Sequence, residues 1–152
     1  MPKKIAIFPG TFDPITIGHL SIINRSLQLV DEVVIAIGIN PNKKTFFSLE
    51  SRMEMMEAFF ENDARISVAS YDCLTVDFAR SIGAEFILRG IRSVVDFEYE
   101  KNIADVNRQI SGIDTFILFT EPEHAHVSSS IVRELLAHGK DVSLFVPPNI
   151  KL

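Results

Sequence analysis

Cysteine, tryptophan and long apolar runs are scarce or missing in this chain of 152 residues. Cys73 is the only cysteine, which excludes an intrachain disulfide and a metal site of clustered cysteines, and we expect it to be a small buried residue. No apolar run reaches the ~20 residues that a membrane-spanning helix needs, and the N-terminus lacks the hydrophobic segment of a signal peptide. The sequence therefore predicts a cytoplasmic protein with no membrane partner.

Positive charge is also in short supply, since 15 Lys and Arg residues face 20 Asp and Glu residues and the net charge is −5. This balance argues against non-specific binding of nucleic acid. An acidic protein that binds anionic substrates must gather its few cations locally, so each lysine or arginine near a turn is informative. The length and the 47% apolar content predict one domain, residues 1–152, with a sizeable core.

Short apolar segments alternate with segments of helical periodicity along the chain. Ser48 can cap one of the helices, and Gly83 can end another. Strands are predicted at residues 3–7, 33–39, 66–69, 86–88 and 114–119, and helices at 20–27, 49–60, 74–81, 94–110 and from 128 or 129 onward. This alternation predicts an α/β fold, namely a Rossmann-like, doubly wound, five-stranded parallel sheet.

The most unusual stretch, residues 8–19, lies between the first predicted strand and the first predicted helix. Thr16 fits an N-cap, which places Gly18 and His19 in the first helical turn. Free N–H groups and the positive end of the helix dipole attract phosphate there, and Gly18 allows a close approach. The alternative is that His19 is an ordinary helix-start residue and Gly10 a plain turn glycine. The density of special residues favours a phosphate site, although the stretch is neither a P-loop nor a three-glycine dinucleotide fingerprint.

Further polar segments follow other predicted strands. Lys43 follows the second strand, Arg89 and Arg92 follow the fourth, and residues 124–130 follow the fifth. Because ligands of a doubly wound sheet bind beyond the carboxyl ends of its strands, we expect these segments to meet residues 8–19 in one anion-binding site. Simpler alternatives are a solvated turn lysine, a surface pair of arginines and a run of serines that only caps a helix.

The block Gly10-Thr11-Phe12-Asp13-Pro14-Ile15-Thr16-Ile17-Gly18-His19 resembles the signature of the nucleotidyltransferase superfamily. Within it, the chain is similar to the phosphopantetheine adenylyltransferase family, where threonine usually replaces the first histidine of the His-x-Gly-His motif. The resemblance continues through residues 41–44, 88–92, 96–100 and 127–130, and therefore runs nearly end to end.

This resemblance implies transfer of the AMP moiety of ATP to 4′-phosphopantetheine, giving dephospho-coenzyme A and pyrophosphate by direct in-line attack. It implies that His19, Lys43 and Arg92 are catalytic, with His19 on the α-phosphate. The residues implied to bind ATP are Thr11, Phe12, His19, Gly90, Ile91, Arg92, Glu100, His124, Ala125, His126, Val127, Ser128, Ser129 and Ser130. Those implied to bind phosphopantetheine are Thr11, Lys43, Thr75 and Arg89.

The same resemblance implies a Mg²⁺ ion carried by ATP, a homohexamer and feedback inhibition by coenzyme A. No metal ligand is expected from the protein, because Glu121, Glu123, His124 and His126 lack the spaced partner of a closed site. Relatives commonly have aromatic residues at positions 124–126, so His124 is expected to stack on the base in their place. On sequence grounds alone, Glu100 could equally be a solvated helix residue.

Other functions remain open at this point. The chain could be a nucleotidyltransferase with another acceptor, such as nicotinamide mononucleotide, or with CTP as donor. It could also be a nucleotide-binding module without catalysis. A nucleic-acid binder with the same fold is disfavoured by the acidic balance.

Overall fold

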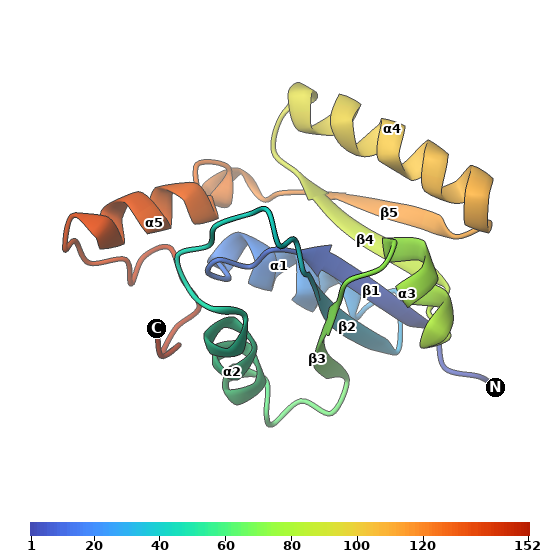
Figure 1. Ribbon diagram of the computed structural model, residues 1–152, viewed down its shortest axis with the longest axis horizontal. Coiled ribbons are helices and arrows are strands. Elements are labelled where there is room, and N and C mark those ends of the chain that lie inside the picture. Colours follow the sequence, from blue (N-terminus) through green and yellow to red (C-terminus); the bar gives the residue numbers. More distant parts are fainter.

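Strands and helices alternate in the computed structural model, which describes residues 1–152 (Figure 1). The elements are β1 (Ile5–Gly10), α1 (Ile17–Ser26), β2 (Glu32–Gly38), α2 (Leu49–Phe59), β3 (Ile66–Tyr71), α3 (Thr75–Ser81), β4 (Phe86–Ile91), α4 (Val94–Ser111), β5 (Asp114–Phe119), the 3₁₀ helix η1 (Pro122–His124) and α5 (Ser129–Ala137). Every predicted strand and helix is present. β1 and β4 extend further than expected, so that Gly10 and Arg89 belong to strands. None of the helices combines the length and apolar character needed to cross a membrane.

The strands form one parallel sheet in the order β3-β2-β1-β4-β5. The chain first winds outward from β1 to β3, then crosses back to β4 beside β1 and continues to β5. This reversal makes the sheet doubly wound, so the predicted Rossmann-like α/β fold is confirmed. Its topological switch point lies between β1 and β4, where such sheets form their ligand crevice.

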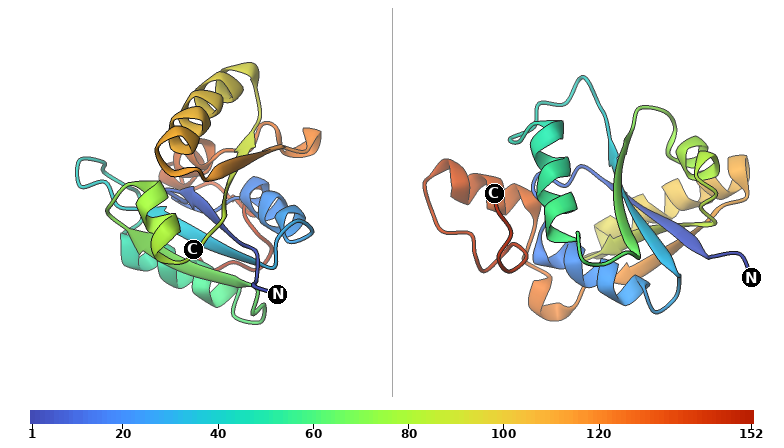
Figure 2. Two further views of the ribbon diagram at one scale, coloured as in Figure 1. Left: turned by 90° about the vertical axis from the view of Figure 1, so that its right-hand side faces the viewer. Right: turned by 90° about the horizontal axis from the view of Figure 1, so that it is seen from below.

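Both faces of the sheet are covered by helices, which explains why the strands are apolar along their length. On one face, Ile22 and Ile23 of α1 and Met56 of α2 join the main core cluster. On the other face, Val76 and Ala79 of α3 pack on the sheet. Figure 2 shows α4 above the β4 and β5 edge, and α5 set apart beyond the sheet with the C-terminal segment.

Helix ends follow the expected cap chemistry. The hydroxyl of Ser48 accepts a hydrogen bond from the N–H of Ser51 at the start of α2, and Ser128 does the same for Ile131 at the start of α5. Gly83 follows α3 with a φ of 71°, a conformation that favours glycine. These signals are local in sequence, and the structure confirms them.

One expectation about burial is wrong, because Cys73 is exposed. It lies in the turn between β3 and α3, where the chain leaves the sheet and no second layer covers it. A small apolar side chain was therefore not a reliable sign of burial at this position.

Candidate active site

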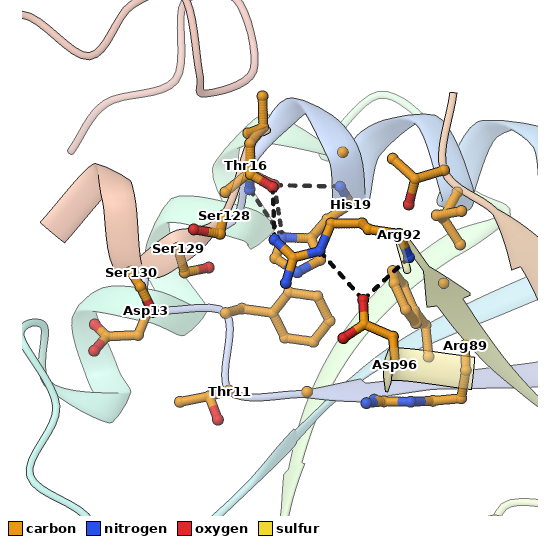
Figure 3. Close-up of a pocket in the computed structure, with 18 of the residues that line it drawn as sticks. Thr11, Asp13, Thr16, His19, Arg89, Arg92, Asp96, Ser128, Ser129 and Ser130 are labelled. Carbon is orange, nitrogen blue, oxygen red and sulfur yellow. Dashed lines mark hydrogen bonds and ion pairs between the residues drawn. The ribbon is translucent and has the colours of Figure 1, made fainter. Parts of the chain in front are cut away.

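A cavity of about 430 Å³ opens at the carboxyl ends of β1 and β4, at the switch point of the sheet. Figure 3 shows side chains entering it from the loop after β1, the start of α1, the end of β4 and the start of α5. The predicted site residues that line it are Thr11, Phe12, His19, Lys43, Arg89, Gly90, Arg92, Glu100, Val127, Ser128, Ser129 and Ser130. His19 and Arg92 therefore share one cavity.

His19 is held by a reciprocal cap at the start of α1. The hydroxyl of Thr16 accepts a hydrogen bond from the N–H of His19, and the N–H of Thr16 donates to His19 Nδ1 over 3.0 Å. Because a backbone N–H can only donate, Nδ1 must be the acceptor. In the neutral ring the proton therefore resides on Nε2, which makes Nε2–H the donor available to a ligand.

The charge state of His19 follows from its surroundings. Burial, followed by the positive charges of Arg89 and Arg92, lowers the pKa of His19 from 6.5 to about 4. The ring is thus neutral near pH 7 in the free protein. It can stabilise a phosphate oxygen as a hydrogen-bond donor without needing a permanent charge.

The side chain of Phe12 packs against the imidazole ring of His19. Its φ of 48° is unusual for a residue other than glycine, and its buried side chain packs edge-on against His19 with ring centroids 4.9 Å apart. Gly10 makes room for it, because a Cβ there would lie 3.0 Å from the Phe12 ring. Glycine at position 10 is therefore favoured by this packing.

Lys43 reaches the cavity from the loop after β2. Its Nζ donates a hydrogen bond to the hydroxyl of Thr11 over 3.1 Å. Lys43 is exposed, and its side chain lines the cavity. The structure thus joins two residues that the resemblance assigned to the phosphopantetheine side.

Arg89 and Glu100 form a bidentate ion pair between β4 and α4. Arg89 Nη2 and Nε lie 2.6 and 2.8 Å from the carboxylate oxygens, and Nη1 donates to the carbonyl of Pro9 over 2.5 Å. Glu100 is only 6% exposed, so it is not a solvated helix residue. This pair fixes the direction of Arg89 along the wall of the cavity.

Arg92 spans the mouth of the cavity. Its Nη1 donates to the carbonyl of Val127 over 3.1 Å, and its Nε lies 3.5 Å from a carboxylate oxygen of Asp96. These contacts leave the other guanidinium nitrogen free of protein partners, and Figure 3 shows the side chain extending toward the start of α5. Arg92 thus lies between the end of β4 and residues 128–130 at the start of α5.

Ser128, Ser129 and Ser130 surround the N-terminus of α5. Ser128 is the N-cap, and Ser129 donates a hydrogen bond to the carbonyl of Pro14, which ties α5 to the loop after β1. Arg133 lies one turn later and donates to the carbonyl of Asp13 and to the hydroxyl of Ser130. Hydroxyls, free N–H groups and a cation therefore meet at one helix end, a favourable seat for phosphates.

Some residues assigned by resemblance lie outside this lining. Ile91 is buried in the core, Ala125 and His126 are exposed, and His124 ends η1 with its Nδ1 buried and without a hydrogen-bond partner. They flank the cavity as neighbours of its lining residues but do not form its wall. Their contact with ATP stays a prediction.

Thr75 lines a second cavity of about 260 Å³ rather than the first. Its hydroxyl is hydrogen-bonded to that of Tyr71 over 2.9 Å. The second cavity runs between the ends of the strands and α4. Both cavities share Pro9, Gly10, Thr11, Arg89, Tyr99 and Glu100 as a common wall.

Two arginines were missed by sequence reasoning. Arg133 reaches the first cavity from α5, and Arg52 contacts the carbonyl of Thr11 from α2. The signal for Arg133 was available, because it follows the serine run by one helical turn. Arg52 had no such signal, since it lies in the middle of an otherwise ordinary helix. No group of three or more His, Cys, Asp or Glu side chains is arranged to hold a metal ion.

The chain is similar to known proteins over nearly its whole length. The cytidylyltransferase-like family matches residues 7–135. The phosphopantetheine adenylyltransferase of Bacteroides fragilis is 60% identical over 147 residues, covering 97% of this chain and 98% of the relative. That of Porphyromonas gingivalis is 50% identical over 152 residues, covering 100% of this chain and 99% of the relative.

A solved structure shares the fold. It is a bifunctional NMN adenylyltransferase/ADP ribose pyrophosphatase from Francisella tularensis, complexed with AMP and a manganese ion, with a TM-score of 0.72 and 18% identity. The match covers 97% of this chain but 45% of that protein.

The fold and the site thus define a nucleotidyltransferase of the cytidylyltransferase-like class. Within this class, the chain belongs to the phosphopantetheine adenylyltransferase family.

Proposed function

We propose that this protein transfers the AMP moiety of ATP to 4′-phosphopantetheine, forming dephospho-coenzyme A and pyrophosphate. The observation that carries the proposal is the pair of cavities with a common wall that includes Thr11 and Arg89. One cavity is lined by cations, hydroxyls and a helix N-terminus, which suits a triphosphate. The other cavity has room for an elongated acceptor. The phosphate of that acceptor would meet the nucleotide at the common wall.

The reaction needs no covalent intermediate with the enzyme. An oxygen of the acceptor phosphate attacks the α-phosphorus of ATP and forms the new P–O bond. The bond from the α-phosphorus to the bridging oxygen breaks, and the electron pair leaves with pyrophosphate. Because the attacking phosphate is already ionised near neutral pH, no general base is required.

The side chains act by position and charge. His19 Nε2–H donates to an α-phosphate oxygen, whose negative charge grows in the transition state. Lys43 and Thr11 hold the acceptor phosphate in line with it. Arg92, Arg133 and the serine run stabilise the charge that develops on the departing pyrophosphate. Groups fixed in this way need no reorganisation when the charge moves.

In this proposal ATP enters as its magnesium complex, in which phosphate oxygens would hold the ion, the usual way that Mg²⁺ is bound with nucleotides. Glu100 contributes by holding Arg89 in the wall that the two cavities share. In this proposal the adenine base extends beyond the residues that line the first cavity. It then approaches Ile91, His124, Ala125 and His126. Thr75 takes part in acceptor binding from the second cavity.

Assembly belongs to the same proposal. The protein forms a homohexamer and is inhibited by coenzyme A, the end product that shares the pantetheine arm of the acceptor. The exposed apolar residues of α4 support self-association, because isolated chains rarely leave such a stripe in water.

One assay tests the proposed reaction. Pyrophosphate release is measured with MgATP and 4′-phosphopantetheine, and dephospho-coenzyme A is identified by mass spectrometry. Nicotinamide mononucleotide replaces the acceptor, and CTP replaces the donor, in parallel reactions. Turnover with only one of these replacements would reject the proposed substrates, and ATP binding without turnover would identify a non-catalytic module.

A further inference from the structure

Arg52 is a buried cation that the proposed reaction does not use. It lies in α2, is 7% exposed, and forms no ion pair within 4.0 Å. Its Nη1 donates to the carbonyl of Thr11 over 2.7 Å, while its Nε lies 3.2 and 3.3 Å from the carbonyls of Phe47 and Ser48. One rigid guanidinium therefore joins the loop after β1 to the segment before α2.

Asp13 makes a second connection between the same two segments. Its carboxylate is 2% exposed and accepts hydrogen bonds from the N–H groups of Phe46 and Phe47 over 2.8 and 2.9 Å. Burial lowers the pKa of Arg52, and the negative charge of Asp13 opposes that effect. The two side chains thus support each other while each binds the backbone of the opposite segment.

The connected segments carry two residues of the proposed site. The first contains Thr11, and the second continues from Lys43, whose Nζ meets the Thr11 hydroxyl over 3.1 Å. Lys43 has no other hydrogen bond or ion pair from its side chain to hold it in place. A displacement of about 1 Å at a reacting group can cost ~10²-fold in rate.

We propose that Arg52 and Asp13 are positioning residues that set Thr11 against Lys43 at the acceptor phosphate. This inference rests on the proposed function, because it assigns the acceptor phosphate to that pair. Arg52 lines neither cavity, and the carboxylate of Asp13, which borders the first cavity, is bound to the backbone of Phe46 and Phe47. Their contribution is the distance between the two side chains that are proposed to hold the acceptor phosphate.

Arg52→Lys is the most informative variant. Lysine keeps the charge, but its side chain is one bond shorter and its single ammonium cannot reach the carbonyls of Thr11 and Phe47 together. We expect kcat to fall about 10- to 100-fold, with the Kd for MgATP and the melting temperature close to those of the wild type. Arg80→Lys is the matched control, since Arg80 donates to the carbonyl of Ser111 far from the cavity, and it should keep full activity.

A double-mutant cycle with Lys43→Ala separates positioning from general damage. If Arg52 acts through Lys43, the Arg52→Lys change should cost less than about twofold in the Lys43→Ala background. The same loss in both backgrounds, or wild-type kcat in Arg52→Lys, would overturn the inference. Asp13→Asn gives a second route through the cycle if the arginine variant does not fold.

A crystal structure of Arg52→Lys supplies a test that does not depend on activity. We expect Thr11 Oγ1 and Lys43 Nζ to move apart from their 3.1 Å separation. If they stay in place, the inference fails whatever the substrates are. If wild-type protein forms no dephospho-coenzyme A while the two atoms do separate in the variant, the proposed function fails and the positioning role stands.

Discussion

The proposed reaction uses His19 as a neutral hydrogen-bond donor, and the residues around it favour that form. Thr16 occupies Nδ1 through a backbone N–H, and burial, followed by the neighbouring arginines, lowers the pKa of the ring and disfavours a second proton. The aromatic ring of Phe12 restricts its rotation from the other side. In the proposed reaction, a fixed Nε2–H would therefore strengthen its hydrogen bond as charge develops on the α-phosphate, which is how differential binding lowers a barrier.

Replacement of His19 by alanine should separate catalysis from binding. We expect kcat to fall by about 10²- to 10³-fold, because a donor aimed at developing charge is removed. The Kd for MgATP should change only a few-fold, since the serine run and the arginines remain. Steady-state pyrophosphate release and calorimetric titration measure the two effects. An equal loss in both would make His19 a binding residue instead.

The same histidine predicts a pH dependence of stability. Its pKa is about 4 when folded and 6.5 in an unfolded chain, so the unfolded state binds more protons between these values. The contribution of His19 to the free energy of unfolding should be fully present above pH 6.5 and should be lost as the pH falls toward 4. The His19 contribution is on the order of 2 kcal/mol after allowance for its partial exposure.

Comparison with His19→Asn isolates that contribution from the carboxylates that also titrate in acid. Urea unfolding of both proteins across this pH range should show a shallower loss in the variant. Parallel curves would mean that His19 keeps its ordinary pKa in the folded protein.

At the scale of elements, the site is built from three junctions where a strand or loop meets the start of a helix. The sequence predicted the first and the last of these well, because Thr16, Gly18 and Ser128 carry local signals for caps and close approach. Alternating apolar and helical segments also predicted the sheet, and through its topology the edge at which ligands bind. Such features depend on neighbours in sequence.

Contacts between distant elements could not be predicted in that way. Glu100 had the spacing of a solvated helix residue, and only the placement of α4 beside β4 brings it to Arg89. Arg52 likewise gained its role from a loop 41 residues away. The position of residues 124–126 depends on how η1 folds against α1, where Glu121 accepts a hydrogen bond from Ser21.

The N-terminal turn of α1 gives a prediction in which stability and binding change in opposite directions. A Cβ on Gly18 would lie 3.5 Å from the Thr16 hydroxyl, an ordinary contact, so the protein itself does not require glycine there. Gly18→Ala should raise the free energy of unfolding by about 0.5–1 kcal/mol, since alanine favours a helix. It should weaken MgATP binding about tenfold, because the new methyl group stands in the path of a phosphate.

Gly83→Ala is the matched control for that change. Gly83 has a φ of 71° and open space around it, so alanine there should cost about 1 kcal/mol of stability through backbone strain alone. MgATP binding should be unaffected. If Gly18→Ala binds MgATP like the wild type in calorimetric titration, phosphate does not approach the backbone at this turn.

At the scale of the whole molecule, charge and apolar surface are both unevenly distributed. The chain has a net charge of −5, yet Lys43, Arg89, Arg92 and Arg133 all line one cavity. Glu100 neutralises Arg89, which leaves fewer free cations than the count suggests. We therefore expect the attraction of ATP to be local to the cavity, because the rest of the surface repels anions. An anion should bind only where it also finds hydrogen-bond donors.

α4 is the most unusual element at this scale, and Figure 1 shows it along the β4 and β5 edge. Glu100 is its only buried residue. Apolar side chains recur on the helix at three- and four-residue spacing and remain exposed, with Val95 at 75% and Val106 at 56%. The stripe consists of Val95, Tyr99, Ile103, Val106 and Ile110.

This stripe predicts that self-association can be removed without unfolding the chain. We expect the wild type to have a mass near six times 17.1 kDa by light scattering. The double variant Val106→Glu, Ile110→Lys keeps the net charge, places a favourable i,i+4 pair on the helix and should yield a smaller, folded species. Leu144→Glu, at a residue that is 78% exposed outside α4, should remain assembled. A monomeric wild type, or a double variant that stays assembled, would show that this face of α4 does not hold the copies together.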